Sequence, residues 1–557
     1  MSSEEDKSKT WFIVLASINA SIGFAHYGYT LSSFNSVQIL LEKYIFPGIS
    51  TTELSLLAST PNLGALFGVF FSQFISKTYG RRHTMIASDV VSFIGVILTM
   101  FHSLVPMVIG RTLTGFACGV ATVIVPIYIV EISKDPLRGS LGIIPVIAGY
   151  LGQMLLFLIG LMVPSFIERQ VPDMGCRILL LVPGVMNILR ITNMMMFFNF
   201  ETPFYLVQTK QHEIAKETLA LLYHEGHSDR MDSLILERDY LYAGEEITFK
   251  DLFKPKYRMV FMVGCALSFG LQFIAVNYIM TFSNMIFSEG TQTTGNNSQP
   301  FILTTMLGVV SLIFGLIAVP LMRHYGRRTF ILLGLGLSSI IELVIAIICY
   351  TDSVGNWLAK LLMIGVIAVS SLFFGSLFYL YVAETLPEVG MGVINYLNWV
   401  LAFILVQNFI HMKEALGYGT LFLISSILLA IVFSFLYKYM VETKDRSRLQ
   451  VLRKYNGLPT NENSPVGSID SFSVDPSIAD NLQKVQSKEP SDSKEGMSRS
   501  KFEELRREAM SHNPEHSALK KSSTSPLASK KKEVTWKDKI MDDSDALPLI
   551  RRGTDKF

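Results

Sequence analysis

The stretch GRTLTGFACGVATVIVPIYIVEISKDPLRG, residues 110–139, decides the fold. Its residues 112–130 are apolar or small, and a helix of this length, rising ~1.5 Å per residue, crosses a hydrocarbon core of ~30 Å. Its glycines leave room for a neighbouring helix to approach closely. Glu131 and Arg138 follow where the apolar run ends, at a depth where a charge reaches water. The stretch therefore predicts a membrane-spanning helix with a charged boundary.

Apolar runs of similar length recur on both sides of this stretch. The 557-residue chain is 50% hydrophobic and 17% charged, with a mean hydropathy of +0.39, unlike a soluble domain. Residues 1–10 are polar without a cleavable signal, so we expect the first run to be a retained anchor. The sequence predicts an all-α membrane protein with twelve transmembrane helices. The runs begin near Trp11, Leu54, Thr84, Met107, Ser140, Cys176, Tyr257, Phe301, Phe330, Trp357, Gly392 and Tyr418.

Short words repeat once in each half of the chain. Gly80-Arg81-Arg82 returns as 326–328, Glu131 as Glu384, and Glu201-Thr202 as 442–443, at nearly constant intervals. Such repetition is typical of a duplicated six-helix unit. We therefore expect a cytoplasmic N-terminus (1–10), two six-helix halves (11–200 and 257–440), a cytoplasmic helical linker (201–256) and a largely disordered cytoplasmic tail (441–557).

Basic residues gather in the loops on one side of the predicted spans. The positive-inside rule makes that side the cytoplasm and places both termini there. The net charge of +2 gives no reason to expect a nucleic-acid partner. The basic residues on this side are Lys77, Arg81, Arg82, Lys134, Arg138, Arg323, Arg327, Arg328, Lys444, Arg446 and Arg448.

The stretch 110–139 resembles the fourth-span signature of the sugar porter family of the major facilitator superfamily, which includes the facilitative hexose transporters. The resemblance extends over nearly all of residues 11–448. It implies the major facilitator superfamily fold and transport by alternating access. In the family, charged residues at the cytoplasmic ends form a latch of salt bridges that closes when the carrier faces outward. By resemblance the latch comprises Arg81, Arg82, Glu131, Arg138, Glu201, Arg327, Arg328, Glu384 and Glu442.

The second half departs from the family pattern of the latch. The family has an arginine about two turns after Glu384, but residues 385–398 contain no basic residue. Lys77 and Arg323 stand where the family has an acid before each Gly-Arg-Arg. We therefore predict a weaker latch in the C-terminal half.

Polar residues on apolar spans indicate the substrate path. Gln272 and Asn277 of the seventh span align with family residues that bind sugar hydroxyls, and Asn398-Trp399 matches a family pair in the eleventh span. Carboxamides suit a neutral polyol because each offers donors and an acceptor without charge. The same side chains could instead join helices through hydrogen bonds. Further substrate-binding candidates are Ser311, Gln153 and Tyr379, followed by Thr30 and Asn35.

Other departures bear on the substrate and the driving force. Pro145-Val146 replaces a sugar-binding glutamine of glucose carriers, and Phe378-Tyr379 replaces a proline followed by a tryptophan. The cargo is therefore predicted to be a hexose or a related sugar or polyol without commitment to glucose. The first span has Gly28-Tyr29-Thr30 where proton-coupled relatives carry a carboxylate, which favours uniport.

Three charged residues lie within spans that the family uses as outer supports. Asp89 of the third span and Arg190 of the sixth lie at similar depth, and we predict that they form a buried ion pair. Glu342 of the ninth span has no predicted partner. A proton relay through these acids is the alternative.

Nothing in the sequence indicates an enzyme, a cofactor or a metal site. The four cysteines, at 118, 176, 265 and 349, are scattered and read as packing thiols. Two other functions stay open: a nutrient sensor that signals through its tail without transporting, and a carrier of an organic acid or urate.

The expected surroundings are a lipid bilayer and a sugar-like solute, at a plasma membrane with endosomal cycling. Residues 545–550 of the tail fit an acidic dileucine signal read by sorting adaptors, and residues 555–557 resemble a PDZ ligand. Asn296 begins a glycosylation sequon in a predicted extracellular loop.

Overall fold

The computed structural model describes residues 2–101, 103–133, 141–223, 231, 234–235, 248–289, 298–351, 356–375, 377–444, 446 and 448–456. Contacts divide the chain into the units Met1–Gly467 and Ser468–Phe557, and every described residue belongs to the first unit. Several features predicted from the sequence lie outside the described residues: Arg138, Lys134, the sequon at Asn296 and the tail motifs.

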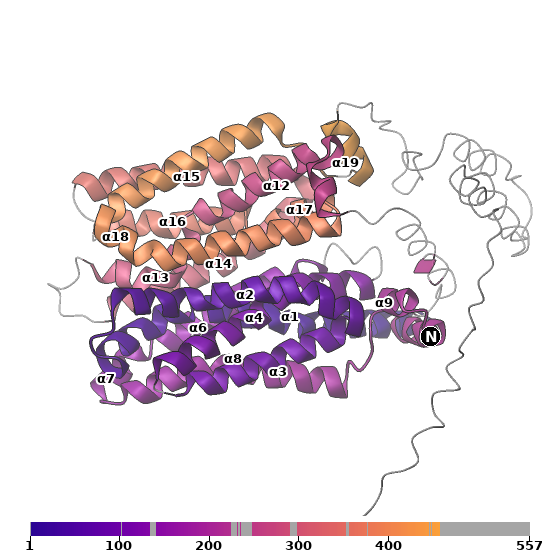
Figure 1. Ribbon diagram of the computed structural model, residues 1–557, viewed down its shortest axis with the longest axis horizontal. Helices are drawn as coiled ribbons and strands as arrows, with labels where there is room; N and C mark the ends of the chain where they lie inside the picture. The colour runs from indigo at the N-terminus through magenta and orange to yellow at the C-terminus, as the bar shows by residue number, and fades with distance from the viewer. Residues whose placement is uncertain are drawn as a thin grey trace, which may run out of the picture. The chain divides into compact units, whose positions relative to one another are not determined.

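The N-terminal half is a bundle whose helices lie side by side in Figure 1. The second helix begins with a capping box, in which the Ser50 hydroxyl accepts from the Glu53 N–H and the Glu53 carboxylate accepts from the Ser50 N–H. The bounds are α1 (Ser2–Leu40), α2 (Thr51–Tyr79), α3 (Arg81–Thr99), α4 (Leu104–Ile132), α6 (Ile144–Gly160) with the short α7 (Val163–Glu168), and α8 (Pro172–Met196).

The glycines of the stretch 110–139 set the distance between α2 and α4. A Cβ on Gly115 would overlap the backbone of Pro61, and one on Gly119 would overlap the backbone of Ala65. The two helices therefore cross with their backbones in contact, as small residues allow inside a membrane.

In the C-terminal half, two spans are interrupted, each forming two helices, and α18 is an unusually long helix of 52 residues. The bounds are α12 (Pro255–Phe273) with α13 (Val276–Ser288), α14 (Gln299–His324), α15 (Arg327–Thr351), α16 (Trp357–Phe373) with α17 (Leu377–Thr385), and α18 (Glu388–Tyr439).

Twelve spans result from these helices. Ten helical stretches of described residues are long and apolar enough to cross a membrane. Within the 52-residue α18, Gly417 has φ +75° and ψ 163°, a conformation that few residues other than glycine adopt, and it divides the helix into two spans. With α1 as the remaining span, the predicted twelve transmembrane helices are confirmed.

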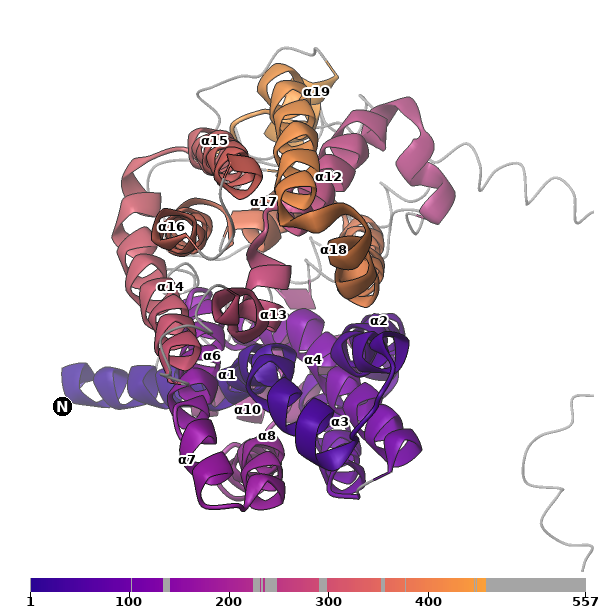
Figure 2. The same cartoon turned by 90° about the vertical axis from the view of Figure 1, so that its left-hand side faces the viewer.

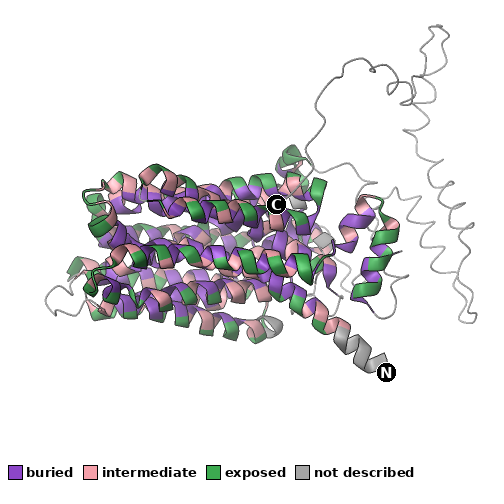
Figure 3. Ribbon diagram, turned by 90° about the horizontal axis from the view of Figure 1, so that it is seen from below, coloured by how far each residue is buried: buried purple, intermediate pink, exposed green. Residues whose placement is uncertain are grey.

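The two halves meet along three pairs of helices. Figure 2 looks along the helices and shows α13 beside α1, α14 beside α6, and α18 beside α2. Figure 3 shows buried and exposed residues alternating along each helix, so each helix turns one face outward. The exposed residues on α2 include Phe67, Phe70, Phe71 and Phe74. Lipid chains, in place of water, would cover such an apolar face.

Short helices precede and follow the second half along the chain. Part of the predicted linker forms α9 (Pro203–Gln208), α10 (His212–Leu222) and the 3-10 helix η3 (Phe249–Phe253). After α18, α19 (Arg448–Tyr455) packs against α12 and α17, with Val451 and Leu452 buried. An apolar pair on one face explains why this part of the tail folds onto the bundle.

Candidate functional site

The two Gly-Arg-Arg repeats lie at the same end of the bundle, which we call the basic end. The opposite end, with the π-helical turn η1 (Leu41–Ile45) and Gly417, is the distal end. At the basic end of the N-terminal half, the Arg81 guanidinium forms a forked pair with both oxygens of Glu131, at 2.8–3.2 Å. The Glu201 carboxylate accepts from the backbone N–H groups of Arg81 and Arg82 at 2.9–3.2 Å, which caps α3. The Arg82 guanidinium donates to Met194 O at 3.1–3.2 Å. These contacts tie α3, α4 and the end of α8 together.

The linker helix α9 joins this network through Tyr205. Its hydroxyl donates to Thr78 O at 2.7 Å, and the Arg81 guanidinium lies 5.5 Å from its ring. Burial raises the pKa of Tyr205, and the negative charge of Glu201 adds to the effect. The phenol therefore stays a neutral donor.

The C-terminal half repeats the arrangement with the matching residues. Glu442 accepts from the N–H groups of Arg327 (2.8 Å) and Arg328 (3.1 Å), as Glu201 does in the first half. Arg327 pairs with Glu384 at 3.3 Å, and Arg328 donates to Tyr437 O at 2.7 Å. The duplication seen in the sequence is therefore a duplication of contacts.

The two networks differ in strength. The side chains of Arg81 and Glu131 are 8% and 12% exposed and meet through a fork, whereas those of Arg327 and Glu384 are 21% and 25% exposed and meet through one contact. A forked, buried pair is the stronger arrangement. Each of these pairs lies within one half of the chain.

At the distal end, hydrogen bonds join one half to the other. Asn35 of α1 donates from Nδ2 to Ser283 Oγ (2.6 Å) and accepts at Oδ1 from the Asn284 N–H (2.8 Å). Ser59 of α2 donates to Gln407 Oε1 of α18 at 2.5 Å. The predicted candidate Asn35 therefore lies in this contact between halves, which holds them together at the distal end.

Three predicted substrate-binding residues meet where the seventh span is interrupted. Gln272 stands at the end of α12 and Asn277 at the start of α13, on either side of the break. The Gln272 Nε2 donates to Asn398 Oδ1 of α18 at 2.7 Å, and the Asn277 Nδ2 donates to Gln272 Oε1. These three side chains, the carboxamide chain, contain no charge. They offer amide donors and acceptors beside one another, which matches the alternating hydroxyls of a polyol.

Trp399, next to Asn398, lies at the contact between halves. It packs with Ala65 and Val69 of α2, and its ring centroid is 5.9 Å from that of Tyr27 in an edge-to-face arrangement. Its indole Nε1 is buried without a hydrogen-bond partner in the described part of the chain. Such a group can donate to a bound solute.

The remaining predicted residues lie outside the carboxamide chain. The Ser311 hydroxyl donates to Leu307 O of its own helix at 2.8 Å, and Gln153 donates to Ser32 Oγ at 2.9 Å, joining α6 to α1. The ring of Tyr379 lies edge-to-face against that of Phe378, with the ring centroids 4.9 Å apart.

The predicted ion pair between Asp89 and Arg190 is confirmed. The Arg190 Nε donates to Asp89 Oδ2 at 2.6 Å, its Nη2 donates to Asp89 Oδ1, and both side chains are 2% exposed. Arg190 also donates to Ala20 O of α1. The pair holds three helices of the first half together, and it lies apart from the carboxamide chain.

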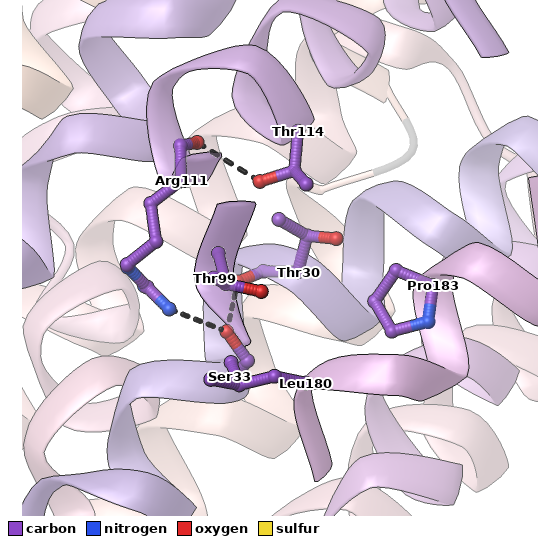
Figure 4. Close-up of a pocket in the computed structure, with 7 residues that line it drawn as sticks. All are labelled: Thr30, Ser33, Thr99, Arg111, Thr114, Leu180 and Pro183. Atoms are coloured by element: carbon purple, nitrogen blue, oxygen red, sulfur yellow. Dashed lines mark hydrogen bonds between the residues drawn. The ribbon is translucent and has the colours of Figure 1, made fainter. Parts of the chain in front are cut away.

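Two features of the interior escaped sequence reasoning. The backbone N–H of Ala275, freed by the break in the seventh span, donates to Glu342 Oε1 at 2.8 Å. A small cavity also lies inside the N-terminal half, beside Arg111, whose guanidinium donates to Leu57 O (2.7 Å) and Ser33 Oγ (3.2 Å) (Figure 4). In the sequence, each of these features is indicated only by a charged residue on an apolar span, Glu342 or Arg111. The cavity is lined by Thr30, Ser33, Thr99, Arg111, Thr114, Leu180 and Pro183.

Comparisons with known proteins agree with this architecture. Residues 14–455 match the family described as "Sugar (and other) transporter". Facilitated glucose transporter member 3 of solute carrier family 2 from Ovis aries is 26% identical over 474 residues, covering 80% of this chain and 93% of the relative. Hexose transporter 1 of Plasmodium knowlesi is 27% identical over 463 residues, covering 77% and 90%.

Solved structures share the fold. The proton:xylose symporter XylE bound to 6-bromo-6-deoxy-D-glucose has a TM-score of 0.67 at 18% identity, covering 81% of this chain and 99% of XylE. A partially occluded, inward-open form of XylE from E. coli has a TM-score of 0.64 at 18% identity, covering 78% and 100%. The predicted major facilitator superfamily fold is thereby confirmed.

Proposed function

The chain belongs to the sugar (and other) transporter family, and from this premise we propose that it carries a small neutral polar solute, a hexose or related polyol, by facilitated diffusion. The relatives support the substrate class, because those reported above are glucose, hexose and xylose transporters.

The observation that carries the proposal is the carboxamide chain at the broken seventh span. Gln272, Asn277 and Asn398 are joined to one another, so a solute that enters exchanges their mutual hydrogen bonds for bonds to its hydroxyls. Little free energy is lost in that exchange, because amide groups bond equally well to one another and to hydroxyls. Trp399, with its unpaired indole N–H, forms an apolar wall with one further donor.

The arrangement of contacts supports alternating access. The networks of Arg81 and Arg327 tie helices together within each half, so each half moves as a unit. Asn35 closes the distal end between the halves. Rocking of the halves breaks the contacts of Asn35 and opens the carboxamide chain to the distal side, as in other carriers built from repeats.

Uniport is proposed because α1 offers no acid at solute depth. Between Lys7 and Leu41 the chain contains no Asp or Glu, and Asp89 is neutralised by Arg190. The basic end faces the cytoplasm by the positive-inside rule, and we place the carrier in the plasma membrane.

Uptake into proteoliposomes tests the proposal. The panel consists of labelled hexoses, polyols and disaccharides, with labelled urate and lactate as anions, each measured with and without a proton gradient. Saturable, gradient-independent uptake of a neutral member is the expected result. Uptake that requires the gradient contradicts uniport, and uptake of anions alone contradicts the substrate class. Binding of a sugar without any flux contradicts transport and favours the nutrient sensor.

A further inference from the structure

The break in the seventh span exposes a backbone donor that a distant acid satisfies. Ile274 leaves the helical conformation with ψ 122°, and α13 resumes at Val276. The N–H of Ala275 between them donates to Glu342 Oε1 of α15 at 2.8 Å. Gln272 and Asn277 flank this point, so the Glu342 side chain supports the segment that positions two members of the carboxamide chain.

Among the residues that the structure describes, Glu342 has no ionic partner. It is 0% exposed, and its Oε2 has no hydrogen-bond partner among the described residues. On α13 the titratable group that faces it is Tyr278, whose hydroxyl lies 3.4 Å from Ser425 Oγ of α18. By contrast, Arg190 of the first half, which is as deeply buried, pairs with Asp89.

The charged groups on the other elements packed against α15 are engaged elsewhere. On α16, Lys360 donates to Phe287 O at 3.0 Å. On α17, Glu384 pairs with Arg327, and the Tyr381 hydroxyl donates to Val441 O at 2.8 Å. On α18, Lys438 lies in the last turn, over the ring of Tyr439. Lys413 of α18 pairs with Glu289 at 2.8 Å. Within the part of the chain that the structure describes, no cation therefore compensates a charge on Glu342.

A carboxylate in this site would hold a buried negative charge against one N–H donor and the first turn of α13. That compensation is small beside the several kcal/mol that an unpaired buried ion costs. The neutral carboxylic acid fits this site better. Its carbonyl oxygen, Oε1, accepts from the Ala275 N–H, and the proton is carried by Oε2, so no charge is buried.

We propose that Glu342 is a proton-binding site whose occupied form stabilises the break in the seventh span and thereby sets solute affinity. One proton from water adds to Oε2 and returns to water at higher pH, independently of the transport cycle; no other bond forms or breaks. Loss of the proton draws water to Oε2 and loosens α15 against α13, so Gln272 and Asn277 no longer lie together. The effect on affinity rests on the proposed transport function, whereas the proton site itself does not.

Transport kinetics provide the first test, with labelled D-glucose as the probe and D-xylose as the second probe. For the wild type, KM should rise on the order of tenfold from mildly acidic to mildly alkaline pH, the effect expected from losing about one hydrogen bond. Glu342→Gln keeps the oxygen that accepts from Ala275 and cannot ionise, so its KM should stay low at every pH. Glu342→Ala should show a high KM without pH dependence. The matched control, Glu414→Gln, removes an exposed acid and should keep the wild-type profile.

Infrared difference spectra between acidic and alkaline samples provide a second test that needs no transport. The wild type should show a carboxylic-acid carbonyl band that is absent from Glu342→Gln and present in Glu414→Gln. Identical spectra for wild type and Glu342→Gln would overturn the inference, as would a Glu342→Gln variant whose KM follows pH like the wild type. If the proteoliposome panel yields no transported neutral solute, the proposed function fails, while the infrared result still decides the state of Glu342.

Discussion

Gln272 and Asn398 meet across 2.7 Å, from the broken seventh span to the eleventh. This hydrogen bond uses the Gln272 amide nitrogen, and the Gln272 amide oxygen accepts from Asn277. The three carboxamides therefore provide hydrogen-bond partners for one another inside the protein. Buried polar groups need hydrogen-bond partners. A solute with several hydroxyls can replace the hydrogen bonds that the carboxamides make with one another. Under the proposed function, the carboxamides bond to one another in the empty protein and to the solute in the loaded one.

Removal of the Asn398 side chain should weaken solute binding. Asn398→Ala deletes one amide from the carboxamide chain, and the loss of about 1.4 kcal/mol of hydrogen bonding corresponds to a tenfold higher KM. The measurement is KM and the maximal uptake rate in proteoliposomes. Asn408→Ala on the same helix is the control, because the Asn408 amide is exposed and donates to Ile404 O of its own helix. Equal KM values for the two variants would refute the role of Asn398.

Removal of the Asn35 side chain should favour an open distal end. Asn35→Ala deletes the bonds to Ser283 and Asn284, each contributing about 1 kcal/mol, and leaves the opposite end unchanged. A cysteine placed at Met285, with the four native cysteines replaced, should react roughly tenfold faster with a reagent added on the distal side. The control Thr351→Ala removes an exposed hydroxyl that bonds within α15. An unchanged reaction rate in Asn35→Ala would show that the distal contacts do not hold the gate.

Breaking the buried pair of the first half should destabilise the protein. Asp89→Asn leaves the Arg190 guanidinium buried without a counter-charge, at a cost of about 3–5 kcal/mol in the free energy of unfolding. The double variant Asp89→Leu with Arg190→Met should recover most of that loss, since it removes both charges. Unfolding in detergent measures both.

The exposed pair of Glu213 and Lys216 provides the control for this prediction. Its side chains are 84% and 59% exposed, so Lys216→Gln should change the free energy of unfolding by less than about 1 kcal/mol. A double variant no more stable than Asp89→Asn would contradict the account of the buried pair.

The latch at the basic end should be asymmetric. Arg81→Gln breaks a forked, buried pair and should cost about 2–3 kcal/mol in the free energy of unfolding. Arg327→Gln breaks a single, partly exposed contact and should cost about 1 kcal/mol or less. Both variants keep the backbone N–H that bonds to the capping glutamate. Unfolding in detergent gives the comparison. Equal costs would refute the prediction of a weaker C-terminal half.

Features set by local pattern could be predicted from the sequence. Spans follow from runs of apolar residues, and the final span was expected at Tyr418, one residue beyond the break at Gly417. The close crossing of α2 and α4 follows from Gly115 and Gly119. The pair of Asp89 and Arg190 follows from their similar depth together with the helix neighbours that the family resemblance implies, because a charge in a membrane is costly without a partner.

Features set by the meeting of distant helices could not be predicted. The bond between Glu342 and Ala275 depends on where the seventh span breaks and on which helix faces the break. The bond from Gln153 to Ser32 likewise depends on the rotation of α6 against α1, which an apolar run leaves open. Periodicity gives the existence of a helix but not its neighbours.

The measurement that tests the central claim most directly is counterflow of labelled hexose into sugar-loaded proteoliposomes, comparing Gln272→Ala with wild type and with Asn408→Ala. The account predicts that wild type and Asn408→Ala exchange the sugar equally well, and that Gln272→Ala requires roughly tenfold more sugar for the same rate while remaining folded. Counterflow in Gln272→Ala with wild-type sugar dependence would contradict the claim that the carboxamide chain binds the solute.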